Sequence, residues 1–419
     1  MDARDRDLLV AMFEAAVAAA EPEKALAPHL PERPKGRTVV IGAGKGAAQM
    51  AAAFERLWGP CEGVVVTRYG YACETQFLRV MEAAHPVPDA AGLAASEALF
   101  AALEGLTADD LVIALVCGGG SALLPAPADG LSFEDEVALN KALLASGAPI
   151  GVMNAIRKQV SRIKGGRLAL AAHPARVVSL IVSDVPGDDP AQVASGPTVP
   201  DAVGKAEALA LAAAYGVVLP AAVAKWLETS PEPPMPDDPR FAGNVVQVVA
   251  SAARSLEAAA SVAEASGVSA AILSDAIEGE ARDVGLVHAA MAREVVTRAR
   301  PFKAPVVLLS GGETTVTIKA EGGRGGRNTE FLLSFARAVD GLSGIAALAA
   351  DTDGIDGTEP NAGAFADGDT ARAMRAAGVD PSAALAKHDA WGAFDAVGAI
   401  FAPGPTGTNV NDFRAVIIR

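Results

Sequence analysis

The stretch from Leu308 to Phe331 reads LLSGGETTVTIKAEGGRGGRNTEF and combines an apolar strand, a glycine-rich loop and a polar helix start. Val306 to Ser310 predicts a buried strand that runs into Gly311 and Gly312. Thr314 to Lys319 alternates β-branched with polar residues, as a half-buried strand does. This succession of strand, loop and helix predicts an α/β unit.

The loop inside this stretch contains four glycines, at positions 322, 323, 325 and 326. Residues without a Cβ let backbone N–H groups approach a ligand closely. Arg324 and Arg327 lie among the glycines, and Asn328 is expected to cap a helix that begins near Thr329. The combination suits an oxyanion such as a phosphate or a carboxylate. The alternative is a flexible hairpin tip followed by a capped surface helix.

Length and composition favour a two-domain α/β protein. The chain has 419 residues, of which 51% are hydrophobic and 20% are charged. Five prolines between Thr229 and Arg240 predict a linker, so we expect domains at 1–235 and 236–419. The net charge of −15 argues against nucleic acid or an anionic membrane as a partner.

The sequence predicts a reduced, cytoplasmic protein. Its three cysteines, Cys61, Cys73 and Cys117, follow no metal-binding or disulfide spacing. No apolar run is long enough to span a bilayer, and five histidines make a His-rich metal centre an unlikely feature of the chain.

A second glycine turn follows an apolar strand at Thr38 to Ile41. Residues 42–47 read GAGKGA and formally match a dinucleotide-binding turn. The next strand ends in Arg68 rather than in an acidic residue for a ribose, although an arginine could accept a 2′-phosphate. Lys45 inside the turn is instead a candidate charge over a transferring phosphoryl group, with a solvated surface lysine as the alternative.

Two further segments offer anion contacts. Leu111 to Cys117 predicts a buried strand that opens into Gly118-Gly119-Gly120-Ser121. Leu123 replaces the glycine that a hydrolase nucleophile elbow requires, so the Ser121 hydroxyl is better interpreted as an anion contact. Arg157 and Lys164 fall on one face of a helix predicted over 154–167, which could attract a substrate anion or be solvated surface.

Carboxylates follow two other predicted strands. Val177 to Ser183 leads into Asp184 and Asp188, which suit Mg²⁺ held with a nucleotide, or a simple Asx-turn. Gly344 to Ala350 leads into Asp351 and Asp353 in a loop whose spacing does not fit an EF-hand. That loop is a Mg²⁺ or substrate-hydroxyl site, or an Asp-Gly turn. Because polar endings recur after nearly every strand, the pattern favours one composite site for phosphoryl transfer.

Several motifs occur in a fixed order along nearly the whole chain. They are Gly42-Ala43-Gly44-Lys45, 117–123, 163–166, Ser183 to Asp188, Ser195-Gly196-Pro197-Thr198, Ser310 to Val316, Gly326-Arg327-Asn328 and Asp351-Thr352-Asp353-Gly354. A chain with these motifs resembles the glycerate 2-kinase family, whose C-terminal part is known as the MOFRL domain. The resemblance implies a MOFRL region at about 305–415 in the second domain.

The resemblance also implies a fold and an activity. The expected fold is an N-terminal Rossmann-like domain with a mostly parallel sheet covered by helices on both faces, a C-terminal α/β domain with a mixed sheet, and an active site in the interdomain cleft. The expected reaction is ATP-dependent phosphorylation of D-glycerate at its 2-hydroxyl, with Mg²⁺ or another divalent cation. The expected partners are small-molecule substrates only, and the protein is a monomer or a homodimer.

Carried onto matching positions, the resemblance gives six candidate residues a role, and the residue pattern supplies the others. Lys45 stabilises transferring charge, Arg327 clamps a carboxylate or phosphate, and Asp351 lies near the acceptor hydroxyl together with Asp353. Further substrate or phosphate contacts are Gly44, Ser121, Arg157, Lys164 and Asn328; nucleotide contacts are Gly118, Gly119, Gly120, Ser195, Gly311, Gly312 and Glu313; metal contacts are Asp184 and Asp188.

Two rival functions stay open from the sequence. One is an NADP-dependent hydroxypyruvate reductase, a name that members of this family have carried. The other is a regulator that binds a sugar acid or a nucleotide without catalysis.

Overall fold

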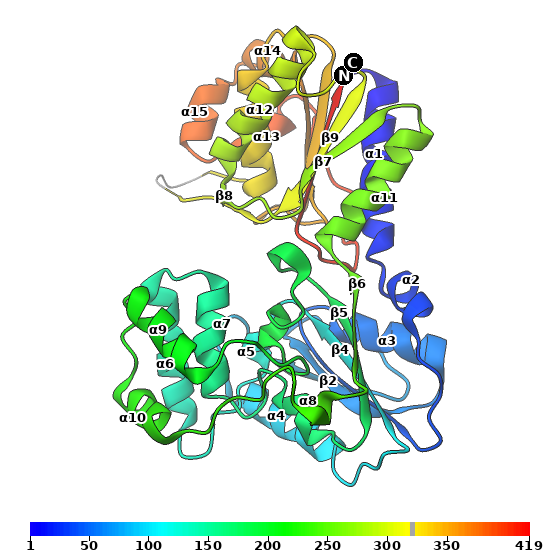
Figure 1. Ribbon diagram of the computed structural model, residues 1–419. Helices are drawn as coiled ribbons and strands as arrows, with labels where there is room; N and C mark the ends of the chain where they lie inside the picture. Colours follow the sequence, from blue (N-terminus) through cyan, green and yellow to red (C-terminus); the bar gives the residue numbers. More distant parts are fainter. Residues whose placement is uncertain (319–322) are drawn as a thin grey trace. The chain divides into compact units, whose positions relative to one another are not determined.

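The computed structural model describes residues 1–318 and 323–419, which form two compact units (Figure 1). We call residues 22–249 the N-terminal unit, and residues 1–21 together with 250–419 the C-terminal unit. This division differs from the expected domains at 1–235 and 236–419. The first helix, α1 (Ala3–Ala19), packs against α11 (Ala252–Ala265) in the C-terminal unit, burying Leu9 and Phe13 there. The proline-rich segment is not the boundary, because the chain returns to the N-terminal sheet after it.

The N-terminal unit is built on a six-stranded sheet with the order β3-β2-β1-β4-β5-β6. The pairings from β3 through to β5 are all parallel. The strands are β1 (Thr38–Ala43), β2 (Glu62–Arg68), β3 (Arg79–Ala83), β4 (Leu111–Cys117), β5 (Arg176–Val182) and β6 (Val245–Ala250). β4 is buried along its whole length, as expected for a central strand of a parallel sheet. The carboxyl ends of these strands therefore lie along one edge of the sheet.

Helices of the N-terminal unit fall into two groups. α4 and α8 contribute Leu99 and Leu168 to a core with Ile41 and Ala114 of the sheet. α6, α7 and α10 form a separate small core around Leu139, Ile156 and similar residues. The helices are α2 (Pro22–Leu26), α3 (Ala47–Trp58), α4 (Ala90–Ala102), α5 (Gly120–Leu123), α6 (Phe133–Ser146), α7 (Ile150–Gln159), α8 (Arg167–Ala171), α9 (Lys205–Ala214) and α10 (Ala221–Thr229), with 3₁₀ turns η1 (Ala27–His29), η2 (Pro186–Asp188), η3 (Val193–Ser195) and η4 (Pro239–Phe241).

The C-terminal unit contains a mixed six-stranded sheet with the order β13-β12-β11-β14-β9-β7. Only β7 and β9 pair in parallel among these strands, and the other four pairings are antiparallel. The strands are β7 (Ser269–Ser274), β9 (Val306–Gly312), β11 (Ile345–Asp351), β12 (Gly363–Asp367), β13 (Ile400–Phe401) and β14 (Asp412–Ile418), and β8 (Gly279–Glu280) pairs separately with β10 (Thr314–Thr315). The mixed sheet confirms the sequence-based expectation. Of the strand expected over 314–319, only β10 is present up to residue 318, and Lys319 lies outside the described residues.

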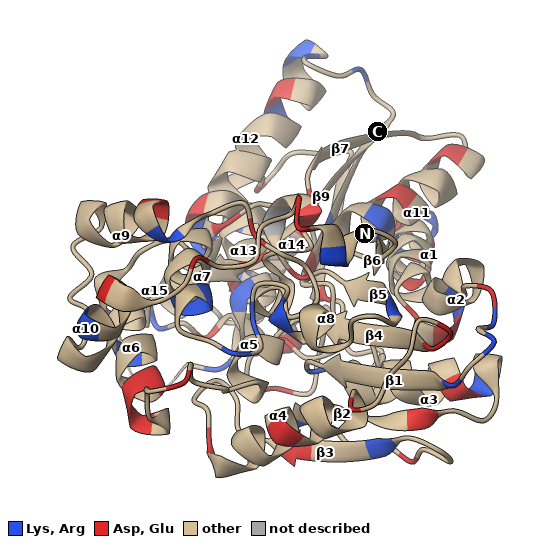
Figure 2. Cartoon of the chain, turned by 60° about the horizontal axis from the view of Figure 1, so that its bottom comes forward, with Lys and Arg blue, Asp and Glu red and all other residues tan. Residues whose placement is uncertain are grey.

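Helices cover both faces of the C-terminal sheet (Figure 1). α1 and α11 pack on the face that carries Val307, Leu348 and Phe413. α12 (Ala281–Arg298) and α13 (Arg327–Ala338) pack on the face that carries Leu308 and Val416, with α14 (Thr370–Ala376), α15 (Pro381–Ala386) and α16 (Ala390–Asp395) beside them. Charged residues lie mainly in helices and loops, and the central strands are largely uncharged (Figure 2). Within the described ranges, no helix combines the length and apolarity needed to cross a membrane.

Candidate functional site

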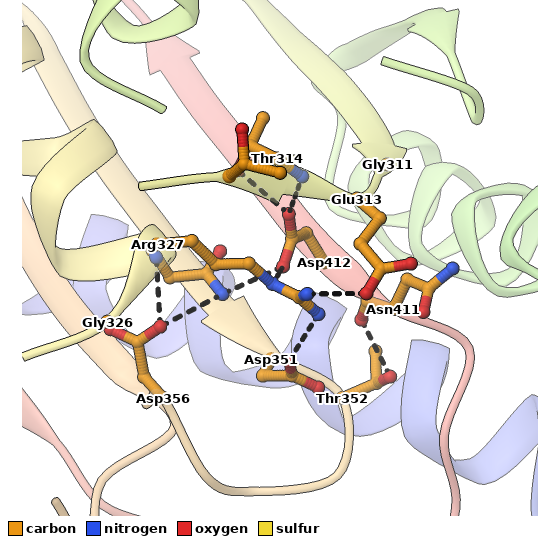
Figure 3. Close-up of polar contacts among 12 residues, drawn as sticks. Gly311, Glu313, Thr314, Gly326, Arg327, Asp351, Thr352, Asp356, Asn411 and Asp412 are labelled. Atoms are coloured by element: carbon orange, nitrogen blue, oxygen red, sulfur yellow. Dashed lines mark hydrogen bonds and ion pairs between the residues drawn. The ribbon is translucent and has the colours of Figure 1, made fainter. Parts of the chain in front are cut away.

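A guanidinium surrounded by carboxylates lies at one edge of the C-terminal sheet (Figure 3). Arg327, the first residue of α13, places Nε 2.6 Å from Asp412 Oδ1, Nη1 2.8 Å from Glu313 Oε1 and Nη2 2.7 Å from Asp351 Oδ2. We call these four residues the Arg327 cluster. Because each guanidinium nitrogen already contacts a carboxylate, Arg327 in this structure holds acidic side chains in place, a different arrangement from the expected open anion clamp.

The register of the sheet brings this cluster together. Asp351 ends β11 and pairs with Asp412 at the start of β14, and Asp412 pairs in turn with Gly312 at the end of β9. Glu313 follows directly. Three chain segments that are far apart in sequence therefore present their polar residues at one place. The antiparallel insertion of β14 between β9 and β11 is what adds Asp412, which the sequence analysis did not single out.

Asp412 is the centre of the hydrogen bonding. Its buried carboxylate accepts from the Thr314 N–H at 3.1 Å, from Asn328 Nδ2 at 2.9 Å and from the fully buried Arg414 guanidinium. Burial lowers the pKa of Arg414, while Asp412 opposes that effect. Two arginines thus share one buried carboxylate, so the charge on Asp412 is needed for both of them.

The electrostatics of the cluster single out Asp351. Burial raises the pKa of Asp351 well above its usual range. The negative charges of Asp353 and Asp412 also raise it, whereas the positive charge of Arg327 lowers it. Burial lowers the pKa of Arg327, but Asp412, Asp351 and Glu313 outweigh it and the net shift is upward. The arginine stays charged, and Asp351 is the group in the cluster whose protonated form burial favours.

The start of α13 is fixed by Asp356, not by Asn328 as expected. The Asp356 carboxylate accepts from the backbone N–H groups of Asn328 and Thr329, both at 2.9 Å. Asn328 lies inside the first helical turn and is fully buried. Gly326 leaves the space for this contact, since a Cβ there would lie 2.4 Å from Asp356 Oδ1. Asp356 therefore positions the turn from which Arg327 projects.

The glycine-rich loop packs against the protein where the structure describes it. Gly323 approaches the backbone so closely that a Cβ would lie 2.1 Å from the Lys387 carbonyl oxygen. Arg324 lies over the Trp391 ring at 4.0 Å, and its carbonyl accepts from the Trp391 N–H. Gly322 lies outside the described residues. The described glycines thus serve internal packing, and Gly312 similarly abuts the backbone of Ile277.

The turn at residues 44–47 in the N-terminal unit uses its own backbone donors internally. The Gly44 N–H donates to Val66 O, the Lys45 N–H to Gly118 O at 2.9 Å, and the Gly46 N–H to Cys117 Sγ at 3.1 Å. A Cβ on Gly44 would lie 2.3 Å from Cys117 Sγ, so glycine is required there by packing against β4. The turn does not offer the bare N–H groups that a dinucleotide pyrophosphate requires.

Lys45 and His85 both lie beside Gly119. A Cβ on Gly119 would lie 3.1 Å from Lys45 Cε and 3.2 Å from His85 Nε2, while one on Gly118 would lie 1.9 Å from an Asp184 carboxylate oxygen. Burial lowers the pKa of His85, and the charges of Lys45 and Arg68 lower it further. The glycines after β4 therefore leave space for the side chains of Lys45, His85 and Asp184. His85 is thus added to the candidate residues that the sequence predicted.

A polar group next to this site contains Arg157, Ser121, Asn154 and Ser195. Arg157 Nη1 lies 2.9 Å from Asn154 Oδ1 and 3.4 Å from Ser121 Oγ, and the two serine hydroxyl oxygens are 2.7 Å apart. The sequence predicted Arg157, Ser121 and Ser195 separately, and the structure brings them together.

Lys164 has a structural position. It is 1% exposed, and its ammonium contacts the Leu124 carbonyl and Glu136. The helix expected over 154–167 ends at Gln159, so Lys164 and Arg157 do not share a helical face. Ser161 instead accepts from the N–H groups of Ile163 and Lys164 in a turn. Because this ion pair is buried, Lys164 is not a solvated surface residue, and a ligand cannot reach its ammonium.

The proposed metal contacts do not form a resident metal site. Asp184 lies beside Gly118, and Asp188 has a left-handed backbone conformation with φ of 54° at the end of η2. In the part of the chain that the structure describes, no group of three or more His, Cys, Asp or Glu side chains could hold a metal ion.

Comparisons with known proteins match the whole chain. A domain of unknown function, DUF4147, matches residues 8–228, and the MOFRL family matches residues 306–412. The chain is 39% identical over 390 residues to a glycerate 2-kinase from Pyrococcus horikoshii, covering 92% of this chain and 88% of that protein. It is 36% identical over 411 residues to a D-glycerate 2-kinase from Thermotoga maritima, covering 97% of each.

The chain is also similar to a protein of known structure and to a relative that carries a different name. The crystal structure of a glycerate kinase from Thermotoga maritima superposes with a TM-score of 0.90 at 35% identity, covering 100% of both chains. A protein from Agrobacterium vitis, provisionally named a hydroxypyruvate reductase, is 51% identical over 420 residues and covers 100% of this chain and 95% of its own.

Proposed function

This chain belongs to the glycerate kinase family built from a DUF4147 and a MOFRL domain, and we propose that it phosphorylates D-glycerate at the 2-hydroxyl with ATP. The products are 2-phosphoglycerate and ADP. The observation that carries the proposal is the full-length match in sequence and fold to a glycerate kinase of known structure. Both candidate sites lie at the strand ends where α/β folds place ligands.

Lys45 is proposed to neutralise charge on the transferring phosphoryl group. Its side chain packs over Gly119, with Cγ 2.9 Å and Cε 3.1 Å from the position that a Cβ there would occupy. Gly118, Gly119, Gly120 and Ser195 are proposed to contact the nucleotide. Asp184 is proposed to contact a Mg²⁺ ion that arrives as part of the MgATP substrate, with Asp188 as a more distant contributor. Phosphoryl transfer depends chiefly on such positioning and charge neutralisation.

Asp351 is proposed to accept the proton of the 2-hydroxyl, assisted by Asp353. The hydroxyl oxygen forms a bond to the γ-phosphorus, the bond from that phosphorus to the bridging oxygen breaks, and ADP leaves. A carboxyl whose pKa is raised by burial is suited to this exchange. Arg327 holds Asp351 at 2.7 Å, with Glu313 as the exposed member of the cluster. Asn328 acts through its hydrogen bond to Asp412.

Hydroxypyruvate reduction is the second candidate, because relatives at 51% identity carry that name. It requires a nicotinamide dinucleotide site. The turn at residues 44–47 resembles such a site, but its N–H groups donate to Val66, Gly118 and Cys117. These internal hydrogen bonds argue against binding of a nicotinamide dinucleotide.

The experiment is a pair of assays on one preparation of the purified protein. ADP release is followed with D-glycerate, ATP and Mg²⁺, and NADPH consumption is followed with hydroxypyruvate. We expect ADP release that depends on D-glycerate, with no NADPH consumption. Hydroxypyruvate-dependent NADPH consumption without ADP release would reverse the assignment, and binding of ligands without turnover in either assay would favour a regulator.

A further inference from the structure

Arg157 has only neutral partners, unlike the two buried lysines near it in the sequence. Its guanidinium contacts Asn140 Oδ1 at 3.2 Å, Asn154 Oδ1 at 2.9 Å and Ser121 Oγ at 3.4 Å. None of the ion pairs found within residues 1–318 and 323–419 includes Arg157. Lys158, by contrast, pairs with Asp201, and Lys164 pairs with Glu136. The one carboxylate that influences Arg157 is Glu136, which acts from a distance.

A cation in this position carries a desolvation cost that its own neighbours do not offset. Burial lowers the pKa of Arg157 to about 10, so the guanidinium remains charged at neutral pH. Uncharged oxygens compensate a buried charge less well than a carboxylate or phosphate does. Arg157 is also partly exposed, so a ligand can reach it. An anionic ligand would therefore complete the site.

The position of Ser121 connects this cation to the proposed phosphoryl site. Ser121 lies two residues after Gly119, over which the Lys45 side chain packs. The Ser121 hydroxyl is shared with Ser195, and Ser195 Oγ lies 2.9 Å from Asn154 Oδ1. Hydrogen bonds among Ser121, Ser195 and Asn154 thus connect the Arg157 guanidinium to α5, which follows β4.

The chemistry of a 2-hydroxy acid matches this arrangement. Its carboxylate carbon is bonded directly to the carbon whose oxygen accepts the phosphoryl group, so a carboxylate subsite must adjoin the phosphoryl site. A planar guanidinium also matches the two oxygens of a carboxylate. We propose that Arg157, with the hydroxyl of Ser121, binds the substrate carboxylate and selects 2-hydroxy acids over neutral polyols. This inference rests on the proposed kinase activity and assigns the group that recognises the acceptor.

The test compares Arg157→Met with Arg167→Met by steady-state kinetics. Arg167 is a matched control, because burial also lowers its pKa to about 10 and its guanidinium donates only to the Lys158 and Lys164 carbonyls. We expect Arg157→Met to raise KM for D-glycerate roughly 10- to 100-fold, as for loss of a charged hydrogen bond, with KM for ATP unchanged. Arg167→Met should leave both KM values near those of the wild type.

Two outcomes would overturn the inference. A rise in KM for ATP with KM for D-glycerate unchanged would assign Arg157 to a nucleotide phosphate, and no change in either would make it a structural cation. If Arg157→Met does not fold, Arg157→Lys keeps the charge but loses the planar fork, and it should still raise KM for D-glycerate.

A binding measurement separates this inference from the kinase assignment. D-glycerate should raise the midpoint of thermal unfolding of the wild type, glycerol should not, and Arg157→Met or Arg157→Lys should lose the D-glycerate effect. If the wild type releases no ADP, the kinase proposal fails, while the carboxylate subsite still stands or falls on these midpoints. An equal shift in the variants would refute the subsite alone.

Discussion

Replacing Asp412 with asparagine should destabilise the C-terminal unit more than any exposed charge change does. The substitution keeps the size of the side chain and removes the negative charge that Arg327 and Arg414 share. Arg414 is fully buried and contacts no other carboxylate among its described hydrogen bonds, so its charge would be left without compensation. Breaking a buried ion pair in this way costs about 3–5 kcal/mol.

The result can be measured as a change in the midpoint of thermal unfolding. For a unit of this size, each kcal/mol shifts the midpoint by about 2–4 °C, so Asp412→Asn should lower it by about 6–20 °C. The control is Asp369→Asn, which removes an exposed ion pair with Arg372 in the same unit and should change stability by less than about 1 kcal/mol. Equal, small effects of both substitutions would refute the role of Asp412 as the shared counter-ion.

Three further predictions concern catalysis and pH. Lys45→Ala should lower kcat about 10²- to 10³-fold with thermal unfolding unchanged, because one charge over the phosphoryl group is lost, and turnover near that of the wild type would contradict the assignment. Asp351→Asn should lower kcat about 10²- to 10⁴-fold. Since burial raises the pKa of Asp351, wild-type kcat should rise with pH on the acid side as that carboxyl ionises, and a pH profile with the same acid limb in the variant would exclude Asp351 as the base. His288 is buried with Nε2 2.8 Å from Ser310 Oγ, and burial lowers its pKa to about 4. The unfolded chain therefore binds this proton more readily, so stability should fall by a few kcal/mol as pH falls from about 6.5 towards 4, and urea unfolding at pH 7 and pH 5 should show a smaller difference in His288→Gln.

Apolar strands were predictable from the sequence because their signal is local. β4 has the predicted bounds, Leu111–Cys117, since a continuous run of apolar and β-branched residues ends at glycine. β12 and β13 were missed, because Gly363–Asp367 is short and rich in small residues and Ile400–Phe401 has only two residues.

The candidate site was predictable only in part, because its assembly depends on strand order. Arg327 and Asp351 stand out after glycine turns and strands, whereas Asp412 gains its place through antiparallel pairing with Asp351 and Gly312. Sequence spacing does not reveal that register. The same limit applies to Lys164, whose basic neighbours suggested a surface face although the chain buries it against Glu136. No neighbouring residue in the sequence marks His85 as a site residue. It lies beside Lys45 only because of the way β3 and β4 are arranged in the sheet.

The measurement that tests the central claim most directly is identification of the phosphorylated product by NMR after reaction with D-glycerate, ATP and Mg²⁺. The account predicts 2-phosphoglycerate, with one ADP formed for each product molecule. Formation of 3-phosphoglycerate would contradict the proposed acceptor hydroxyl, and the absence of any phosphorylated glycerate would contradict the kinase assignment itself.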